Sequence, residues 1–408
     1  MPVGRFPFTR DNKKYGRVVS INKKGRLLMD RRKFLEIATK AITLSGIAGI
    51  NIILSKKIFA QESFDWSHEQ FKYDLGEFTL KNGGTLKDAF LLVDCHGTLN
   101  SSKSNVIVYP TCYAGNHFLN RGSIGRNRAM DPDKYFIVIP NMIGCGQSSS
   151  PSNTAYPHDG PRFPQVTYWD NIEAQNRLLT SHYGINNPLM YVGFSMGGQQ
   201  AFHWGALHGG RTGAIVPVAG SAVTTPHNWL FLEGCKKALQ ADSNFNGGDY
   251  DSPPEAGLRA FSTVYASWFY DQVGYREGLH LKTFNGFKNM SEWLEFAYNH
   301  FSSFDANDLL AMMYTWQNGN IGSHEKFGGD WKKALSAITC PALVMPSETD
   351  LYFPPSDNKI EVSYMPNADL KIIPSKRGHV GGAMVPGLCP EESEFCDQQM
   401  KKLLQKIG

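Results

Sequence analysis

The pentapeptide GFSMG at residues 193–197 carries the clearest chemistry in the sequence. It has the form Gly-x-Ser-x-Gly, follows the apolar run PLMYV and precedes a segment with helical character. The glycines permit a tight turn, and a serine on that turn lies at the N-terminus of the next helix, where backbone N–H groups favour developing negative charge. The pattern therefore predicts Ser195 as a nucleophile on a strand–turn–helix elbow.

A serine hydroxyl becomes a nucleophile with the help of a histidine base, which an acid orients. On folds with this elbow the chain order is serine, acid, histidine. Asp350 ends the run PALVMPSETD and His379 follows the next run, so both are expected at carboxyl ends of strands, where open α/β sheets place their sites. We predict Ser195, Asp350 and His379 as a catalytic triad. The competing acids are Glu348, Asp357 and Asp369, for which solvated surface roles fit better, and the competing histidines are His203, His208 and His227, for which packing or surface roles fit better.

Two N–H donors are needed to stabilise the tetrahedral intermediate of acyl transfer. One is expected from Met196, directly after the serine, and the other from the loop TCYAGNHF, where we assign Tyr113. A plain connecting loop is the alternative reading of that segment. Cys112 lies beside Tyr113, but no motif marks it as a nucleophile.

Short apolar runs alternate with amphipathic segments after residue 61, which is typical of a mostly parallel sheet covered by helices. Residues 225–331 differ, because they are rich in aromatic side chains and show helical patterns without strand character. We expect a helical lid there, with a second helical layer of the core as the alternative. The predicted strands lie at residues 71–80, 89–96, 105–110, 134–140, 188–194, 213–222, 340–350 and 368–375.

The N-terminal region has the pattern of a targeting signal. A pair of arginines at 31–32, a weakly apolar run at 41–54 and SKKIFAQ follow the order of a twin-arginine signal peptide, with Ala60 at the cleavage point. We expect residues 1–60 to be an extension and signal, a mature domain at 61–408, and export to the periplasm or the cell exterior by the twin-arginine machinery. A start at Met29 would place the arginines where such signals have them. An ordinary buried helix and an uncleaved membrane anchor are the alternatives.

Composition limits the remaining functions. A net charge of +4 over 408 residues is too mild to indicate nucleic-acid binding. The chain has no His-Glu-x-x-His, no phosphate-binding P-loop and no Cys-x-x-Cys motif, so we expect neither a metal nor an organic cofactor. Seven cysteines imply no complete disulfide framework, although Cys389 and Cys396 could pair in an oxidising compartment. The sequence leaves a homodimer open.

Five segments together resemble the homoserine O-acetyltransferase family of the α/β-hydrolase superfamily. They are GFSMGGQQAFHW, FPQVTYWDNIEAQNRLLTSHYGI, FNGGDYDSPPEAGLRAF, FDANDLLAMM and ETDLYFPP, in the family's order and between about residues 105 and 384. The resemblance implies an α/β-hydrolase fold with a helical lid, the triad Ser195, Asp350 and His379, and backbone donors at Tyr113 and Met196.

Two departures from that family concern the substrate. The resemblance implies substrate contacts at Lys236, where the family has an arginine, and at Val380, where it has an aspartate directly after the histidine. Lysine offers a point charge in place of a bidentate fork, and valine offers no polar contact. Together with the export signal, these departures favour ester hydrolysis. The alternative is O-acyl transfer from acyl-CoA to an alcohol, and a third hypothesis is an inactive binding protein on the same fold.

Overall fold

The computed structural model describes residues 20–21, 27–28, 64–284 and 286–408. The chain divides into two units, Met1–Ser63 and Phe64–Gly408. In the first unit, β1 (Ser20–Ile21) and β2 (Leu27–Leu28) pair antiparallel. The predicted signal peptide lies outside the described residues. Among the described helices, none is both long and apolar enough to cross a membrane.

An eight-stranded sheet with the order β10-β9-β8-β7-β5-β6-β4-β3 forms the centre of the second unit. The six strands β10, β9, β8, β7, β5 and β6 pair parallel in this order. β4 pairs antiparallel with both of its neighbours, β6 and β3. The predicted mostly parallel sheet is therefore confirmed. The strands are β3 (His68–Thr79), β4 (Thr85–His96), β5 (Val106–Val108), β6 (Phe136–Pro140), β7 (Met190–Phe194), β8 (Ala214–Val218), β9 (Ala342–Val344) and β10 (Ala368–Leu370).

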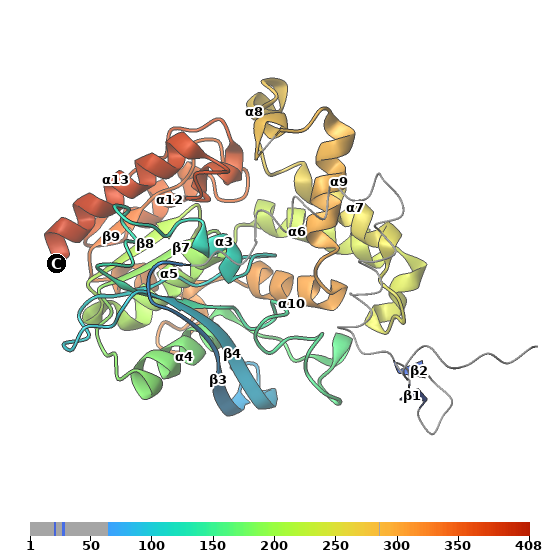
Figure 1. The fold of residues 1–408 in the computed structure, drawn as a ribbon, viewed down its shortest axis with the longest axis horizontal. Helices are drawn as coiled ribbons and strands as arrows, with labels where there is room; N and C mark the ends of the chain where they lie inside the picture. Colours follow the sequence, from blue (N-terminus) through green and yellow to red (C-terminus); the bar gives the residue numbers. More distant parts are fainter. Residues whose placement is uncertain (1–19, 22–26, 29–63, 285) are drawn as a thin grey trace, which may run out of the picture. The chain divides into compact units, whose positions relative to one another are not determined.

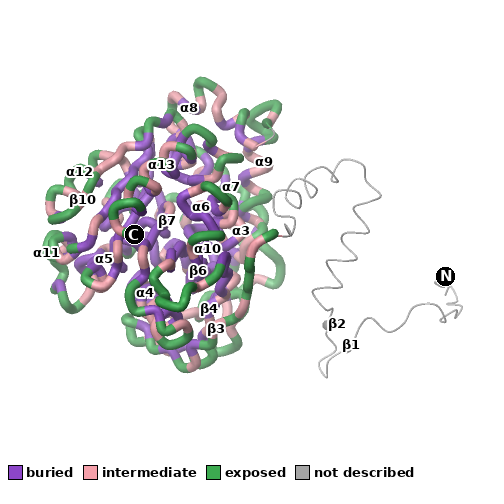
Figure 2. Tube along the Cα trace, turned by 60° about the vertical axis from the view of Figure 1, so that its left-hand side comes forward, coloured by how far each residue is buried: buried purple, intermediate pink, exposed green. Residues whose placement is uncertain are grey.

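Both faces of the central strands are buried because helices cover each of them (Figure 1). Alternate residues of a strand point to opposite faces. Tyr191 of β7 packs in one apolar cluster with Phe202, whereas the next residue, Val192, packs in another with Met400. Figure 2 shows this buried layer in purple. The covering helices are α3 (His117–Arg121), α4 (Tyr168–Arg177), α5 (Met196–His208), α11 (Trp331–Ser336), α12 (Pro355–Val362) and α13 (Pro390–Ile407).

A helical segment separates β8 from β9 in the chain. Its aromatic side chains form a third buried cluster with residues around the elbow, including Tyr113 and Met196. The segment holds α6 (Pro226–Gln240), α7 (Glu255–Ala266), α8 (Gln272–Arg276), α9 (Met290–Phe301) and α10 (Ala306–Gln317). Short 3₁₀ or π turns complete the unit at Gly160–Arg162, Leu178–His182, Gly209–Arg211, Ser243–Gly248, Leu279–Lys282, Ile321–Ser323 and Gly378–Gly382.

Candidate active site

Ser195 stands at the turn between β7 and α5, as the motif predicts. Its backbone has φ 57° and ψ −123°, a conformation that is uncommon for a residue with a side chain, and its N–H donates to the carbonyl of Val218 at 2.9 Å. A Cβ on Gly193 would lie 2.1 Å from the carbonyl oxygen of Gly197, so the turn closes only with glycine there. The surrounding sheet and helix therefore hold Ser195 in a strained backbone geometry, which is a mark of functional sites.

Ser195, His379 and Asp350 form one hydrogen-bonded chain. His379 Nε2 lies 2.9 Å from Ser195 Oγ, and His379 Nδ1 lies 2.7 Å from Asp350 Oδ2. The other oxygen of Asp350 accepts backbone N–H groups of Tyr352 at 2.8 Å and Phe353 at 3.2 Å. All three members are at most 5% exposed. This arrangement places a proton acceptor on the serine hydroxyl and a carboxylate behind the imidazole.

The competing acids and histidines lie elsewhere. Glu348 and Asp369 are exposed, Asp369 with Lys371 3.0 Å from its carboxylate. His203 is buried in α5, where its Nδ1 contacts the carbonyl of Gln199 at 2.7 Å, and burial lowers the pKa of His203 to about 4. The other competing residues also lie outside the hydrogen-bonded set of Ser195, His379 and Asp350. Asp357 is half-buried on α12, His208 is the last residue of α5, and His227 packs on Trp268.

Aromatic rings fix the orientation of His379, and sequence reasoning missed their role. Phe194 stacks on the imidazole with a centroid distance of 4.8 Å and an interplanar angle of 28°. Tyr352 meets it edge-on at 4.6 Å and 82°. Both residues lie beside recognised positions, in GFSMG and ETDLYFPP, so the signal was present but gave no reason to place either ring on the histidine.

The two residues predicted as N–H donors lie on either side of the elbow. Met196 is the first residue of α5, and Tyr113 lies in the loop between β5 and α3. Among the described residues, no carbonyl or side chain accepts from the N–H of Tyr113. Its phenol donates to the carbonyl of Leu309 at 3.2 Å, and its ring stacks on Tyr265 at 5.4 Å. Tyr113 thus connects the loop beside the elbow to the helical segment.

The two predicted substrate contacts differ in their surroundings. Lys236 lies on α6 and forms an ion pair with Glu233 one helical turn away, with an N–O distance of 2.6 Å. That partner already neutralises its charge, and the structure does not bring Lys236 into the hydrogen-bonded chain of Ser195. Val380 directly follows His379 and is half-buried, with its N–H 3.5 Å from the carbonyl of Phe269.

The cysteines offer no second nucleophile. All seven are free and buried in the described part of the chain, including Cys389 and Cys396, which are not bonded to each other. Burial raises the pKa of Cys112 to about 12, so this thiol beside the predicted oxyanion loop stays protonated at neutral pH.

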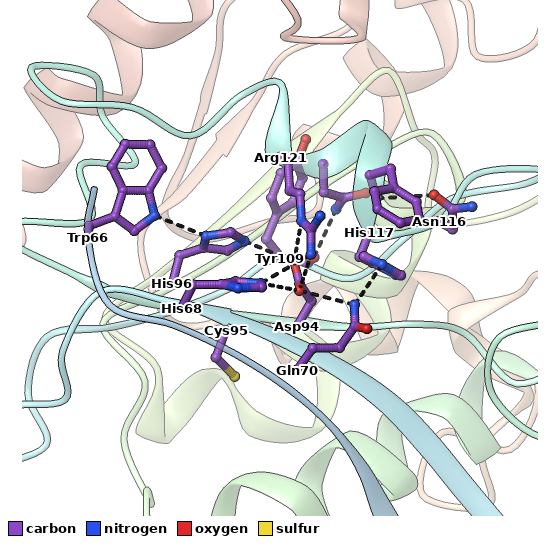
Figure 3. A network of polar contacts seen from close by, with 12 residues as sticks. Trp66, His68, Gln70, Asp94, Cys95, His96, Tyr109, Asn116, His117 and Arg121 are labelled. Carbon is purple, nitrogen blue, oxygen red and sulfur yellow. Dashed lines mark hydrogen bonds and ion pairs between the residues drawn. The ribbon is translucent and has the colours of Figure 1, made fainter. Parts of the chain in front are cut away.

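A second carboxylate–histidine arrangement lies at the β3–β4 edge of the sheet (Figure 3). Asp94 contacts His68 Nε2 at 2.8 Å and His96 Nε2 at 2.9 Å. Arg121 of α3 donates to both of its oxygens, at 2.6 and 2.9 Å. Burial raises the pKa of Asp94, but the hydrogen bonds from His96, Arg121 and His68 outweigh it and hold the pKa well below its ordinary range. We call His68, Asp94, His96 and Arg121 the edge cluster.

The edge cluster has metal-ligand types, but its hydrogen bonds oppose a cation. His68, Asp94 and His96 offer ligand atoms within 4.8 Å of one another. Both carboxylate oxygens, however, already accept from Arg121, whose charge would repel a metal ion. Trp66 Nε1 donates to His96 Nδ1 at 3.1 Å, which assigns the imidazole proton to Nε2, the atom that faces Asp94. The cluster is a neutralised ion-pair network.

Comparisons with known proteins agree with this geometry. Residues 95–380 match the family described as alpha/beta hydrolase fold. A probable esterase of Corynebacterium glutamicum is 37% identical over 317 residues, covering 75% of this chain and 88% of the relative. An ethyl acetate hydrolase of Pseudomonas veronii is 35% identical over 312 residues, covering 76% and 88%. The solved structure of the acetyl esterase MekB is 33% identical with a TM-score of 0.79, covering 83% of this chain and 97% of that chain.

Homoserine O-acetyltransferases are similar at lower identity. The enzyme of Trichormus variabilis is 27% identical over 322 residues, covering 74% of this chain and 86% of the relative. The resemblance found in the sequence is therefore right about the fold and too narrow about the branch, because relatives named as esterases share more of the sequence. The α/β-hydrolase fold is confirmed, and the chain belongs to the alpha/beta hydrolase fold family.

Proposed function

We propose that the chain is a serine esterase that cleaves short-chain carboxylic esters through an acyl-enzyme on Ser195. The observation that carries the proposal is the continuous hydrogen-bonded chain from Ser195 Oγ through His379 to Asp350. Relatives named probable esterase and ethyl acetate hydrolase support an ester substrate with a small acyl group. They also support the preference for hydrolysis over transfer that the sequence predicted.

In the first half-reaction, Ser195 Oγ attacks the ester carbonyl carbon while His379 Nε2 takes the hydroxyl proton. The carbonyl oxygen becomes an oxyanion, to which the N–H groups of Met196 and Tyr113 donate. The intermediate collapses, the carbon–oxygen bond to the alcohol breaks, and His379 returns the proton to the leaving oxygen. Asp350 keeps the imidazole oriented and stabilises its charged form.

In the second half-reaction, water attacks the acyl-enzyme and gives its proton to His379 Nε2. Collapse releases the carboxylic acid and returns the proton to Ser195. Over the two half-reactions, the enzyme consumes one ester and one water and produces one alcohol and one carboxylic acid. The same acyl-enzyme would serve an acyltransferase if an alcohol replaced water, and the similarity to homoserine O-acetyltransferases makes that the second candidate.

We propose that the segment predicted as a helical lid at residues 225–331, whose helices α6 to α10 run from Pro226 to Gln317, covers this site. Tyr265 of α7 stacks on Tyr113, and its carbonyl accepts the phenol of Tyr352 at 3.1 Å. These contacts support an aromatic wall that excludes water from the reacting atoms.

The decisive experiment uses the chain without residues 1–60 and p-nitrophenyl acetate as substrate. We expect a burst of p-nitrophenol followed by turnover, and neither in Ser195→Ala with an unchanged melting temperature. Hydrolysis that survives in Ser195→Ala would overturn the proposal. If turnover is slow in water and accelerates strongly when L-homoserine is added, the second candidate replaces the first.

We also propose export by the twin-arginine machinery, with cleavage after Ala60. The α/β unit begins at Phe64, so this cleavage leaves it intact. Its seven free, buried cysteines need no oxidising compartment for folding, as expected of a domain that folds before export. In cell fractionation, a chain starting at Met29 should reach the periplasm, and a variant with Arg31→Lys and Arg32→Lys should stay in the cytoplasm. Equal distribution of the two chains would contradict export by this route.

Gel filtration of the periplasmic protein tests whether it is a homodimer.

A further inference from the structure

Gln200 of α5 joins the two segments that supply the predicted oxyanion donors. Its side chain is fully buried. The amide Nε2 donates to the carbonyl of Thr111 at 3.0 Å and lies 3.3 Å from the carbonyl of Met196. Thr111 lies in the loop that carries Tyr113, two residues before it, and Met196 is itself the other predicted donor residue. One side-chain amide therefore touches both halves of the oxyanion site.

The orientation of this amide is fixed by its neighbours. Two backbone carbonyls face Nε2, and carbonyls only accept, so the nitrogen must point toward them. The oxygen Oε1 accepts from Gln175 Nε2 of α4 at 2.7 Å. Gln175 in turn accepts the phenol of Tyr191 on β7. All members are buried, and a flipped Gln200 would place its oxygen against two carbonyls at a high cost.

The loop beside the elbow needs such a connection. Ala114 has φ 46°, in the left-handed region, so the loop backbone does not lie in an ordinary conformation for its residues. A Cβ on Gly197 would lie 3.0 Å from the carbonyl of Pro110, which shows how closely α5 approaches the end of β5. At this short separation the Gln200 side chain spans the gap directly.

We propose that Gln200 is a positioning residue that sets the distance between the N–H groups of Tyr113 and Met196. Donors aimed at the oxyanion stabilise it only when they are preorganised at hydrogen-bond distance. Without the Gln200 amide, the loop at Thr111 loses its side-chain hydrogen bond to α5 and keeps only packing contacts with it, so one donor shifts from the developing charge. The inference rests on the proposed serine-esterase function.

Gln199 provides a matched control, because it lies next in the same helix and is also fully buried. It accepts the phenol of Tyr168 at 2.6 Å and donates to Thr224 Oγ1 at 3.1 Å, and none of its side-chain bonds reaches the Thr111 loop. Changing either glutamine to leucine removes buried hydrogen bonds of similar number. Only the change at Gln200 should affect the oxyanion.

The experiment compares kcat and KM of Gln200→Leu and Gln199→Leu for p-nitrophenyl acetate, and their inhibition by a trifluoromethyl ketone, which forms an oxyanion on serine. Removal of a direct donor costs about 10²–10³ in kcat, so we expect a loss of roughly 10- to 50-fold in Gln200→Leu. KM should change by less than about three-fold, and the inhibition constant should rise in parallel with the loss of kcat. Gln199→Leu should keep kcat within about three-fold at a comparable loss of melting temperature.

Equal losses of kcat in the two leucine variants, or an unchanged inhibition constant in Gln200→Leu, would overturn the inference. If Gln200→Leu does not fold, Tyr191→Phe tests the same connection more gently, since it frees Gln175 and so loosens Gln200. A kcat in Tyr191→Phe that is a few-fold lower with unchanged KM supports the inference, and an unchanged kcat contradicts it. Wild-type hydrolysis that does not depend on Ser195 would instead reject the proposed function, which keeps the two failures distinct.

Discussion

Asp350 and Asp94 are both buried aspartates that hydrogen-bond a histidine, but their remaining partners differ. Asp350 receives one imidazole and two backbone N–H groups, and the far nitrogen of its histidine faces a serine hydroxyl. Asp94 receives two imidazoles and a guanidinium (Figure 3). In the first arrangement, the imidazole of His379 lies beside a serine hydroxyl group from which it can accept a proton. In the second, the permanently charged guanidinium of Arg121 is paired with the carboxylate.

This difference separates the catalytic role proposed for Asp350 from the structural role inferred for Asp94. A neutral imidazole that is oriented by neutral dipoles and one carboxylate can take up a proton and pass it on. In the edge cluster, the charge of Arg121 already compensates Asp94, and the N–H of Trp66 occupies the free nitrogen of His96. The carboxylate–histidine pair is thus the same chemical unit in both places, and the two differ in the group that faces the second imidazole nitrogen: a serine hydroxyl for His379 and a tryptophan N–H for His96.

The largest expected effect comes from Asp350→Asn. The asparagine can still accept from the backbone N–H groups of Tyr352 and Phe353, so the fold should persist. It no longer offers a carboxylate to His379 Nδ1, and kcat should fall by about 10⁴-fold, as in other serine triads. Steady-state hydrolysis of p-nitrophenyl acetate and a melting curve measure the two effects. A kcat within ten-fold of wild type would show that Asp350 is not the orienting acid.

Asp94→Asn should have the opposite pattern, with a large loss of stability and little change in kcat. It leaves Arg121, whose side chain is 12% exposed, without its carboxylate, and loss of one partner of a buried ion pair costs about 3–5 kcal/mol of unfolding free energy. kcat per folded molecule should stay within a few-fold. Urea denaturation measures the loss, and adding Arg121→Met should recover part of it because no unpaired charge remains. A large fall in kcat at full stability would make Asp94 part of the active site.

The contrast also explains what the sequence could predict. Ser195, Asp350 and His379 each follow a strand, and a local motif or the fixed order along the chain marks each of them. The parallel sheet was predictable for the same reason, since apolar runs ended by proline or glycine repeat along residues 105–194. Rules that act within one segment therefore predicted most of the fold and named three residues that the structure brings within hydrogen-bond distance of one another.

The edge cluster was not predicted because its members come from three separate segments: Asp94 and His96 share β4, but His68 reaches them through strand pairing and Arg121 through helix packing. β3 and β4 pair antiparallel with His68 opposite His96 and Gln70 opposite Asp94, a register that no short motif encodes. Arg121 then arrives from α3, 27 residues beyond Asp94. The ring of Phe194 on His379 and the bonds of Gln200 were missed for the same reason, because they depend on packing between distant segments.

Acid should weaken the edge cluster through His96. Burial lowers the pKa of His96 below its ordinary value of 6.5, more than the contact with Asp94 raises it. As the pH falls below 6.5, His96 binds a proton in the unfolded chain but stays neutral in the folded chain. The free energy of unfolding therefore decreases as the pH drops. His96→Gln removes this contribution, which is worth about 1.4 kcal/mol for each unit of pKa shift. Urea denaturation at pH 7.5 and pH 5.0 should show a smaller stability loss in His96→Gln than in wild type, and equal losses would contradict the assignment.

The smallest effect is expected at Lys236, a charge pair outside both arrangements. The side chains of Lys236 and Glu233 are 29% and 20% exposed, and pairs near the surface contribute about 0–1 kcal/mol. Lys236→Met should therefore leave the melting temperature and the KM for neutral esters nearly unchanged. Lys237→Met is the matched control, since Lys237 Nζ lies 3.6 Å from the same carboxylate on a more exposed side chain. A KM that rises ten-fold only in Lys236→Met, and only for an ester that carries a carboxylate, would show that Lys236 leaves Glu233 to bind substrate, and the charge pair would then belong to the active site.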